Sequence, residues 1–403
     1  MDPKLLFTAA LGLVRPWKCD RVEFSGEPKK LDLGIDFERG SQLKCPECGK
    51  MSPVHDTVEK RWRHLNFFQY ECELVARVPR IKCEKDGVRL VELPWARSGS
   101  GFTLMFEALT MALCQQMPVA DVAEILGEQD TRLWRVIQYY VEQAQAKKSW
   151  AKVKRIMVDE TSSRRGHKYV TNFVDADTRE LLLMTEGRGS ESFEIFQEEL
   201  KKHKGEPTQI ELIGMDMSPA YQKGAREYFP NAKVVFDHFH LMQWAGNAVD
   251  EVRKELRREG ADMKDGLWAI RGNSFTRSAE QLERRHELMR QYPKLGRAIG
   301  LRESLQDALQ AEDSLCLKQW LGWAQRSRLK PFQELGRKIK AHWEGIVAFL
   351  ETRMTNGVIE AINGLLQLAK RLARGFRSFK TFQIMGYLKA GKLKLSTPQL
   401  SPT

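Results

Sequence analysis

The order of strands and helices between residues 155 and 237 constrains the fold of this 403-residue chain more than any other feature. Short apolar runs predict strands there, and stretches with apolar residues at helical spacing predict helices. The predicted elements are strands at 155–160, 169–174 and 181–185, a helix at 193–200, a strand at 210–216, a helix at 219–228 and a strand at 233–237. This order predicts a mixed sheet with helices packed on it.

Two of these predicted strands end in acid, with Asp159 near the end of the first and Asp216 at the end of the fourth. The carboxyl ends of strands are where α/β sheets commonly place their functional sites. Three strands, a helix, a strand, a helix and a strand is the order of the ribonuclease-H-like fold. We therefore expect an α/β multidomain protein with a ribonuclease-H-like catalytic core, a mixed sheet.

A third acid lies near the start of a long amphipathic helix predicted at residues 355–374. Thr355 or Asn356 can cap its start, and Gly375 follows its end. One side of the helix is apolar. Another side carries polar residues at three- and four-residue steps, namely Glu360, Asn363, Gln367, Arg371 and Arg374. A solvated helix with ordinary salt bridges is the alternative, but the acids at two strand ends favour a functional face.

The charge of the chain favours an anionic partner. The formal net charge is +12 and the pI is near 9.3, with Lys and Arg spread along the whole length. Nucleic acid is the leading candidate, and charge that serves solubility alone is the alternative. The apolar run at residues 5–14 is too short to span a membrane, so we expect no membrane contact. Seven cysteines in a chain of this length indicate a reducing compartment, with paired cysteines on metal.

The paired cysteines are Cys45 and Cys48, which form a CxxC knuckle whose tight turn lets two thiolates converge on one metal ion. Cys83 lies 35 residues further on and begins a second knuckle that lacks its second cysteine. The fourth ligand is therefore open. Asp86 has the right offset, and carboxylates do bind zinc. The competing ligands are Cys72, His55 and His64. Reduced cysteines without metal are the alternative.

Residues 96–147 predict three helices, with a turn at Gly127 between the second and the third. A short helix, a glycine turn and a helix are the outline of a helix-turn-helix unit. Arg132 and Arg135 lie near the start of the last helix, where base-reading side chains usually sit. Such outlines also arise by chance in helical bundles, but the basic charge favours DNA binding.

These observations divide the chain into five expected regions. They are an N-terminal zinc-binding domain at 1–95, a helix-turn-helix DNA-binding unit at 96–147, the first part of the ribonuclease-H-like catalytic domain at 148–245, an all-helical insertion at 246–345, and the closing helix of the catalytic domain with a basic tail at 346–403.

Several motifs together point to one family. They are Val158-Asp-Glu160, Gly214-Met-Asp-Met-Ser-Pro-Ala-Tyr221, Phe236-Asp-His-Phe-His240, Asn356-Gly-Val-Ile-Glu-Ala-Ile-Asn-Gly364, Lys370-Arg371 and Gly375-Phe-Arg377. With the CPxCG knuckle and the helix-turn-helix outline, the chain resembles the DDE transposases of bacterial insertion sequences, specifically the ISL3 family, over nearly its whole length. The departure is Asp86, which replaces a Cys or His of the second knuckle.

The resemblance implies a transposase that binds the terminal inverted repeats of an insertion sequence and catalyses metal-dependent DNA strand cleavage and strand transfer. It implies that Asp159, Asp216 and Glu360 are the catalytic triad. These carboxylates would hold two Mg²⁺ ions, which Mn²⁺ can replace, and Asp159 would bridge them. One structural Zn²⁺ is expected at Cys45, Cys48, Cys83 and Asp86.

Further expectations concern the DNA. Asn363 would touch the scissile phosphate or a nearby water, and Asp237 and His240 would orient the substrate or the metal shell. For these last two, a packed strand-to-helix junction is the alternative. The residues expected to contact phosphates are Lys370, Arg371, Arg374 and Arg377. The expected partner is double-stranded DNA, both terminal repeats and target, bound by a homodimer on paired ends in the bacterial cytoplasm at the nucleoid.

Two other functions stay open at this point. One is a ribonuclease-H-fold nuclease or Holliday-junction resolvase, which uses the same acids without joining strands. Such an enzyme should lack the amino-terminal DNA-reading half that this chain has. The other is a catalytically silent DNA-binding protein descended from a transposase, which the intact acids argue against.

Overall fold

A computed structural model describes residues 2–164, 166, 168–263, 270, 278–311 and 313–400. Parts of four expected regions lie outside this description, namely residue 1 of the N-terminal zinc-binding domain, residues 165 and 167 of the first part of the catalytic domain, residues 264–269, 271–277 and 312 of the helical insertion, and residues 401–403 of the tail. The chain divides into two compact units, one of Met1–Ala144 with Lys394–Thr403 and one of Gln145–Leu393.

The first unit is built around a six-stranded sheet. Its elements are α1 (Pro3–Ala10), β1 (Trp17–Ser25), β2 (Lys30–Phe37), β3 (Gln42–Lys44), β4 (Met51–Arg63), β5 (Glu71–Cys83) and β6 (Gly87–Leu90). The strand order is β1-β2-β5-β4-β3, and β6 pairs with β5. Leu31, Leu33 and Ile35 alternate along β2 and are buried, as a strand with one face on a core requires.

Three helices follow the sheet in this unit, α2 (Leu104–Gln116), α3 (Val119–Leu126) and α4 (Asp130–Ala146). The hydroxyl of Thr103 caps α2 by accepting a hydrogen bond from the backbone N–H of Phe106. Gly127 ends α3 with a φ of +67°, a left-handed conformation that a residue without Cβ adopts at little cost. The predicted order of helix, glycine turn and helix is confirmed.

The second unit contains a five-stranded mixed sheet of order β11-β10-β7-β8-β9. Its elements are β7 (Arg155–Arg164), β8 (Lys168–Asp175), β9 (Glu180–Glu186), α5 (Glu191–Lys202), the 3₁₀ turn η1 (Pro207–Gln209), β10 (Leu212–Met215), α6 (Pro219–Tyr228) and β11 (Lys233–Phe236). Strands β7, β8 and β9 form an antiparallel meander, and β10 runs parallel to both β7 and β11. The predicted fold class and element order are confirmed.

One predicted boundary is wrong. Strand β7 does not end at Glu160 but continues to Arg164, because its antiparallel pairing with β8 extends that far. Pairing with the parallel neighbour β10 stops at Met157, opposite Gly214. Asp159 therefore lies in the middle of β7, two residues beyond the point where β10 leaves it.

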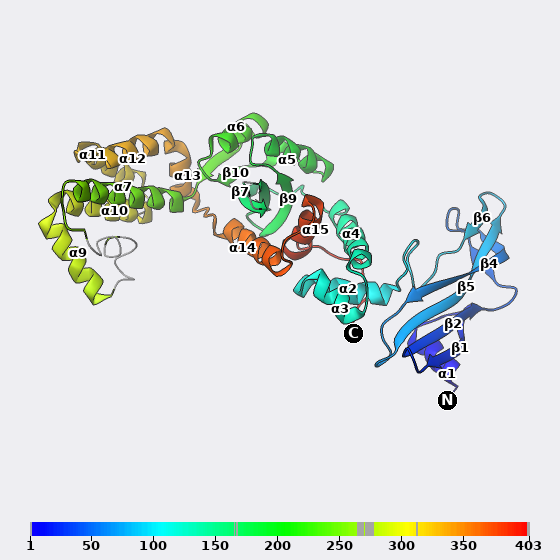
Figure 1. The fold of residues 1–403 in the computed structure, drawn as a ribbon. Coiled ribbons are helices and arrows are strands. Elements are labelled where there is room, and N and C mark those ends of the chain that lie inside the picture. The colour runs from blue at the N-terminus through cyan, green and yellow to red at the C-terminus, as the bar shows by residue number, and fades with distance from the viewer. Residues whose placement is uncertain are drawn as a thin grey trace. The chain divides into compact units, whose positions relative to one another are not determined.

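Helices cover both faces of this sheet (Figure 1). On one face, Phe173 of β8 packs against Phe193 and Phe196 of α5, with ring centroids 5.4 and 4.4 Å apart. On the opposite face lie α14 (Gly357–Leu372) and α15 (Phe379–Ala390). Gly386 lets α15 approach β9 closely, since a Cβ there would lie 2.9 Å from Cε of Met184.

Between β11 and α14, all described elements are helices. They are α7 (His238–Arg258), α9 (Ala279–Gln291), α10 (Pro293–Gln310), α11 (Ser314–Arg326), α12 (Lys330–Ala341) and α13 (Trp343–Thr352). Their contacts include a buried 2.7 Å hydrogen bond from the indole N–H of Trp320 to the carbonyl of Leu301. Across the described residues, no helix has the length and apolar character needed to cross a membrane.

Candidate active site and zinc site

The three acids of the predicted triad lie on three neighbouring elements of the second unit. Asp159 lies in β7, Asp216 directly follows β10, and Glu360 lies in the first turn of α14. Asp216 is fixed locally, because its Oδ1 accepts a 2.9 Å hydrogen bond from the backbone N–H of Ser218. The side chain of Glu360 is exposed.

Asp159 lies in an environment that disfavours its negative charge. Its pKa is raised to about 6, chiefly by burial. The backbone N–H of Glu160, which donates to Asp159 Oδ1 at 2.8 Å, opposes this rise, and so does His240. The carboxylates of Glu160 and Asp216 add to it. A cation would favour the ionised form of a partly buried acid that lies near two others, so these residues fit a divalent metal ion.

The structure brings Asp159 and Asp216 within electrostatic reach of each other, with Glu360 on the helix that covers the same sheet. It does not draw the three carboxylates together as tightly as a preformed cage. Among the described residues, one group of three or more Cys, His, Asp or Glu side chains has its donor atoms within 4.8 Å of one another. This group is the cysteine cluster in the first unit, and the three acids do not form such a group.

Helix α14 contacts β7 through polar side chains. Asn363 donates from Nδ2 to Asp159 Oδ2 at 2.8 Å. Gln367 donates to the hydroxyl of Thr161 at 2.6 Å and to a backbone carbonyl at 2.8 Å. Lys370 donates to the same carbonyl, and burial lowers the pKa of its ammonium group. Asn363 and Lys370 were expected to contact DNA, but both side chains are directed at the protein.

The remaining predicted phosphate-binding residues differ from Lys370 in their exposure to solvent. Arg371, Arg374 and Arg377, at the end of α14 and just beyond it, are exposed. The backbone carbonyl of Arg377 accepts a hydrogen bond from Arg164 of β7, which attaches this segment to the sheet. Three cations on one exposed segment can contact a phosphate backbone.

The segment from Asp237 to His240 joins β11 to α7. Asp237 is buried and caps α7, since its Oδ1 accepts from the backbone N–H of Phe239 at 3.3 Å and lies 3.0 Å from His238 Nδ1. This is the packed strand-to-helix junction that the sequence left as an alternative. His240 instead lies close enough to the acids for its charge to lower the pKa values of Asp159 and Glu160.

Some residues of this site did not emerge from sequence reasoning. Glu160 has a raised pKa, first because it is half-buried and then because Asp216 is near, while Arg188 and a hydrogen bond with Tyr221 lower it. Asn172 of β8 lies fully buried and donates to Asn363. Its signal was an amide between the apolar residues Val170 and Phe173 of a strand, where Asn is disfavoured.

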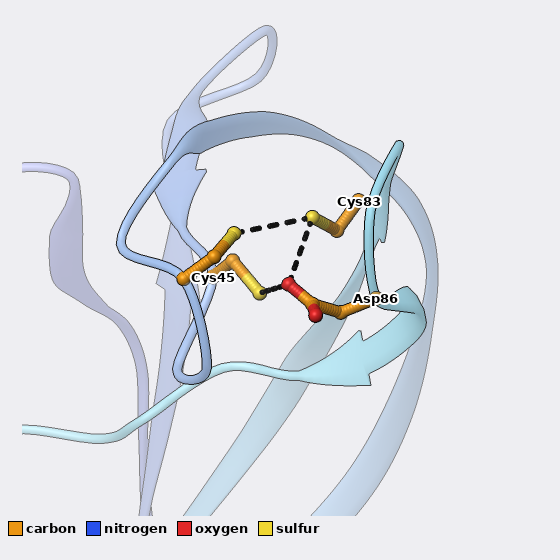
Figure 2. A group of neighbouring side chains, drawn as sticks. Cys45, Cys83 and Asp86 are labelled. Carbon is orange, nitrogen blue, oxygen red and sulfur yellow. Dashed lines mark hydrogen bonds between the residues drawn. The ribbon is translucent and has the colours of Figure 1, made fainter.

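The cysteine cluster of the first unit consists of Cys45, Cys48, Cys83 and Asp86, all four donor atoms lying within 4.8 Å of one another (Figure 2). Asp86 Oδ2 lies 3.4 Å from the sulfur of Cys45 and 3.3 Å from that of Cys83, and the sulfurs of Cys48 and Cys83 are 3.5 Å apart. Three thiolates and one carboxylate around a common point fit a tetrahedral Zn²⁺ ion.

The competing zinc ligands lie outside this cluster. Cys72 is buried in β5, and burial raises its pKa to about 12. The ring of His64 forms a 2.9 Å hydrogen bond between Nδ1 and the hydroxyl of Thr103. His55 lies in β4 and is exposed.

In the helix-turn-helix unit, the two predicted base-reading residues differ. Arg135 of α4 is exposed. Arg132 donates to Glu128 Oε2 at 2.6 Å, and its guanidinium group lies 4.3 Å from the ring centroid of Phe102. A base contact by Arg132 therefore competes with an internal ion pair, whereas Arg135 has no such contact described.

A ribonuclease-H-like sheet with one acid on its central strand β7 and another directly after β10, preceded in the chain by a zinc-type knuckle and a helix-turn-helix unit, defines a metal-dependent enzyme that acts on DNA. Comparison with protein families gives the particular group. A family model described as "Transposase" matches residues 156–385, one described as "Helix-turn-helix domain of transposase family ISL3" matches residues 91–141, and one described as "zinc-finger of transposase IS204/IS1001/IS1096/IS1165" matches residues 41–86. The chain belongs to the ISL3 family of DDE transposases.

Curated relatives agree over nearly full length. The transposase for insertion sequence element IS1557 of Mycobacterium tuberculosis is 26% identical over 417 residues, which cover 93% of this chain and 92% of the relative. The transposase for insertion sequence element IS1001 of Bordetella parapertussis is 26% identical over 404 residues, which cover 95% of this chain and 97% of the relative. The chain is thus a DNA-binding enzyme of transposition, and its family implies strand cleavage with a divalent metal ion.

Proposed function

We propose that this transposase cleaves and joins DNA strands at Asp159, Asp216 and Glu360, after binding the terminal inverted repeats of its insertion sequence. The observation that carries the assignment is the position of Asp159, partly buried near Asp216 and hydrogen-bonded to the helix that carries Glu360 in its first turn. Hard carboxylate oxygens are the ligands that Mg²⁺ prefers. The proposed cofactor is therefore two Mg²⁺ ions, for which Mn²⁺ substitutes.

When bound, such ions activate the attacking water or 3′-hydroxyl and stabilise charge on the leaving oxygen. The chain itself holds the ligands. The backbone N–H of Glu160 and the amide of Asn363 donate to different oxygens of Asp159 and thereby fix the carboxylate. Each carboxylate oxygen has two lone pairs, so each keeps one for a metal ion, as a bridging ligand requires.

DNA binding is proposed to divide between two surfaces. Arg135, with Arg132 beside it, would read bases of the terminal repeat from the start of α4. Arg371, Arg374 and Arg377 would hold phosphates of any sequence near the cleavage site. Because cleaving and joining two ends requires both to be held together, the proposed active species is a homodimer on paired ends.

The first unit is proposed to contain one structural Zn²⁺ bound by Cys45, Cys48, Cys83 and Asp86. The geometry of the four donor atoms and the match to a zinc-finger model of transposases support this ligand set. The domain boundaries proposed with it are those expected from the sequence, at residues 95, 147, 245 and 345.

The test uses linear DNA that carries the element's own ends and flanks. Asp159→Ala, Asp216→Ala and Glu360→Ala should each abolish cleavage and joining, while gel-shift affinity for the ends stays within about twofold, because Ala removes metal ligands and no proposed DNA contact. Glu351→Ala is the matched control, since Glu351 is an exposed acid of the same unit that pairs with Lys233. Full activity in any triad variant removes that residue from the assignment, and cleavage without joining by the wild type indicates a nuclease.

A further inference from the structure

Asp159 has a buried asparagine as its direct neighbour across the sheet. Asn172 of β8 is the register partner of Asp159 in β7, so both side chains lie on the same face. Asn172 is completely buried. A fully buried amide needs hydrogen-bond partners, which points to a specific contact.

That contact is a chain of two hydrogen bonds that reaches Asp159 through α14. Asn172 donates from Nδ2 to Asn363 Oδ1 at 2.7 Å, and Asn363 donates from Nδ2 to Asp159 Oδ2 at 2.8 Å. Asn363 thus bridges a cross-strand pair from above the sheet. It lies one helical turn after Glu360, so the same bridge attaches the helix that carries the third acid.

The direction of the two bonds follows from the carboxylate. An ionised Asp159 can only accept, so Asn363 must turn its NH₂ group toward it. The carbonyl oxygen of Asn363 then faces Asn172, which must also present its NH₂ group. Asn172 Oδ1 is left without a hydrogen-bond partner among the described residues. By donating to the carbonyl oxygen of Asn363, Asn172 holds the Asn363 amide in the orientation that the ionised Asp159 requires.

We propose that Asn172 is a positioning residue for the catalytic metal site, acting on Asp159 through Asn363. It holds the NH₂ group of Asn363 toward Asp159, and this holds one carboxylate oxygen in place and sets the spacing between Asp159 and Glu360. The inference rests on the proposed triad.

A purely structural role for Asn172 predicts that its replacement lowers the melting temperature, which the following contacts argue against. Helix α14 is also attached to β7 by Gln367 and Lys370, so it stays docked without the asparagine bridge. A buried amide with an unpaired oxygen stabilises a sheet less than an apolar side chain of similar size. Asn172→Leu should therefore keep or raise the thermal stability, whereas the positioning role predicts a weaker metal site.

The experiment measures Mn²⁺ binding to the full-length, zinc-loaded chain by electron paramagnetic resonance, together with thermal unfolding and the cleavage rate on element ends. Asn172→Leu should weaken Mn²⁺ affinity or slow cleavage by about 10- to 100-fold, the usual effect of removing a group that orients a metal ligand. Its melting temperature should not fall. Gln383→Leu is the matched control, because Gln383 donates to the carbonyl of Met184 and attaches a helix without an acid to the same sheet.

A double variant tests the route. Asn363→Leu should be at least as harmful as Asn172→Leu, and adding Asn172→Leu to it should change nothing further, because the two act in series. Unchanged Mn²⁺ affinity and cleavage in Asn172→Leu, or fully additive losses in the double variant, overturn the inference. Asp159→Ala separates this from the triad: if it leaves Mn²⁺ binding intact, the proposed metal site itself is wrong.

Discussion

Replacing Glu107 by alanine should loosen the helix-turn-helix unit by about 3 kcal/mol. Glu107 of α2 is completely buried, and its carboxylate is the common acceptor of three side chains. Arg97 donates at 3.0 Å, Ser100 at 2.6 Å and Tyr140 of α4 at 2.8 Å. Burial and the Glu107 carboxylate raise the pKa of Tyr140, so the phenol stays protonated and donates throughout the physiological range.

The magnitude follows from the groups left behind. Breaking a buried ion pair by removing one partner costs about 3–5 kcal/mol. The lower end applies here, because the side chain of Arg97 is 20% exposed and its guanidinium already stacks 4.0 Å from the ring centroid of Tyr139. Tyr140→Phe removes one hydrogen bond to a charged acceptor and should cost about 1.5–3 kcal/mol.

Native-state hydrogen exchange on the full-length chain measures this locally, since amides of α2 and α4 report the opening free energy of their own unit. Glu107→Ala should lower their protection and weaken preference for the terminal repeat, because α4 carries the residues that we propose to read bases. Glu124→Ala, an exposed acid on α3, is the control. A loss below about 1 kcal/mol in Glu107→Ala would refute the reasoning, because surface substitutions alone produce such values.

Three further expectations follow. Cys45→Ser should unfold the region around residues 40–90, since structural zinc supplies folding energy of order 10 kcal/mol in zinc-finger peptides. Elemental analysis should show about one equivalent of zinc less than in the wild type, and active wild-type protein without zinc would contradict this expectation. Burial and the preceding arginine lower the pKa of His64 to about 4 in the folded chain, below its unfolded value of about 6.5. Because the unfolded chain then binds the extra proton, up to about 3 kcal/mol of stability should be lost as the pH falls from 6.5 to 4. An NMR titration of a ring proton of His64 that places its pKa near 6.5 would exclude this loss of stability. Arg371→Ala should reduce the slope of log affinity against log salt concentration by about 0.9 for all DNA. Arg135→Ala should instead cost about 1–3 kcal/mol of the preference for the terminal repeat over random DNA. Salt titrations on specific and random duplexes measure both effects.

The parts of the site that were predictable from sequence depend on local patterns. A CxxC knuckle contains its own geometry, so the positions of Cys45 and Cys48 followed from spacing alone. The order of strands and helices was likewise predictable from the spacing of apolar residues. The end of β7 was not, because Glu160 looks like a polar strand terminus until the partner strand is known. Antiparallel pairing to β8 keeps β7 extended as far as Arg164.

The buried asparagine was missed for a related reason. The local sequence around Asn172 does not indicate that Asp159 lies opposite it in the sheet, or that the helix starting at Gly357 covers both residues. Such contacts join residues about 190 and 200 positions apart in the chain, since Asn172 and Asn363 are separated by 191 residues and Asp159 and Asn363 by 204. Only the register of the sheet and the docking of α14 bring them together.

Helix α14 illustrates why a polar helix face does not identify its partner. Asn363, Gln367 and Lys370 recur at four- and three-residue steps, the same spacing that on a surface helix marks a solvated or DNA-binding side. All three instead donate hydrogen bonds to β7, where the strand carries Asp159 and leaves polar oxygens to be satisfied. An apolar face would pack there without meeting those acceptors, and the resulting unpaired groups would cost more than the added contact gains. The polar face of α14 is therefore what allows a sheet to keep an ionisable aspartate at its centre beneath a helix.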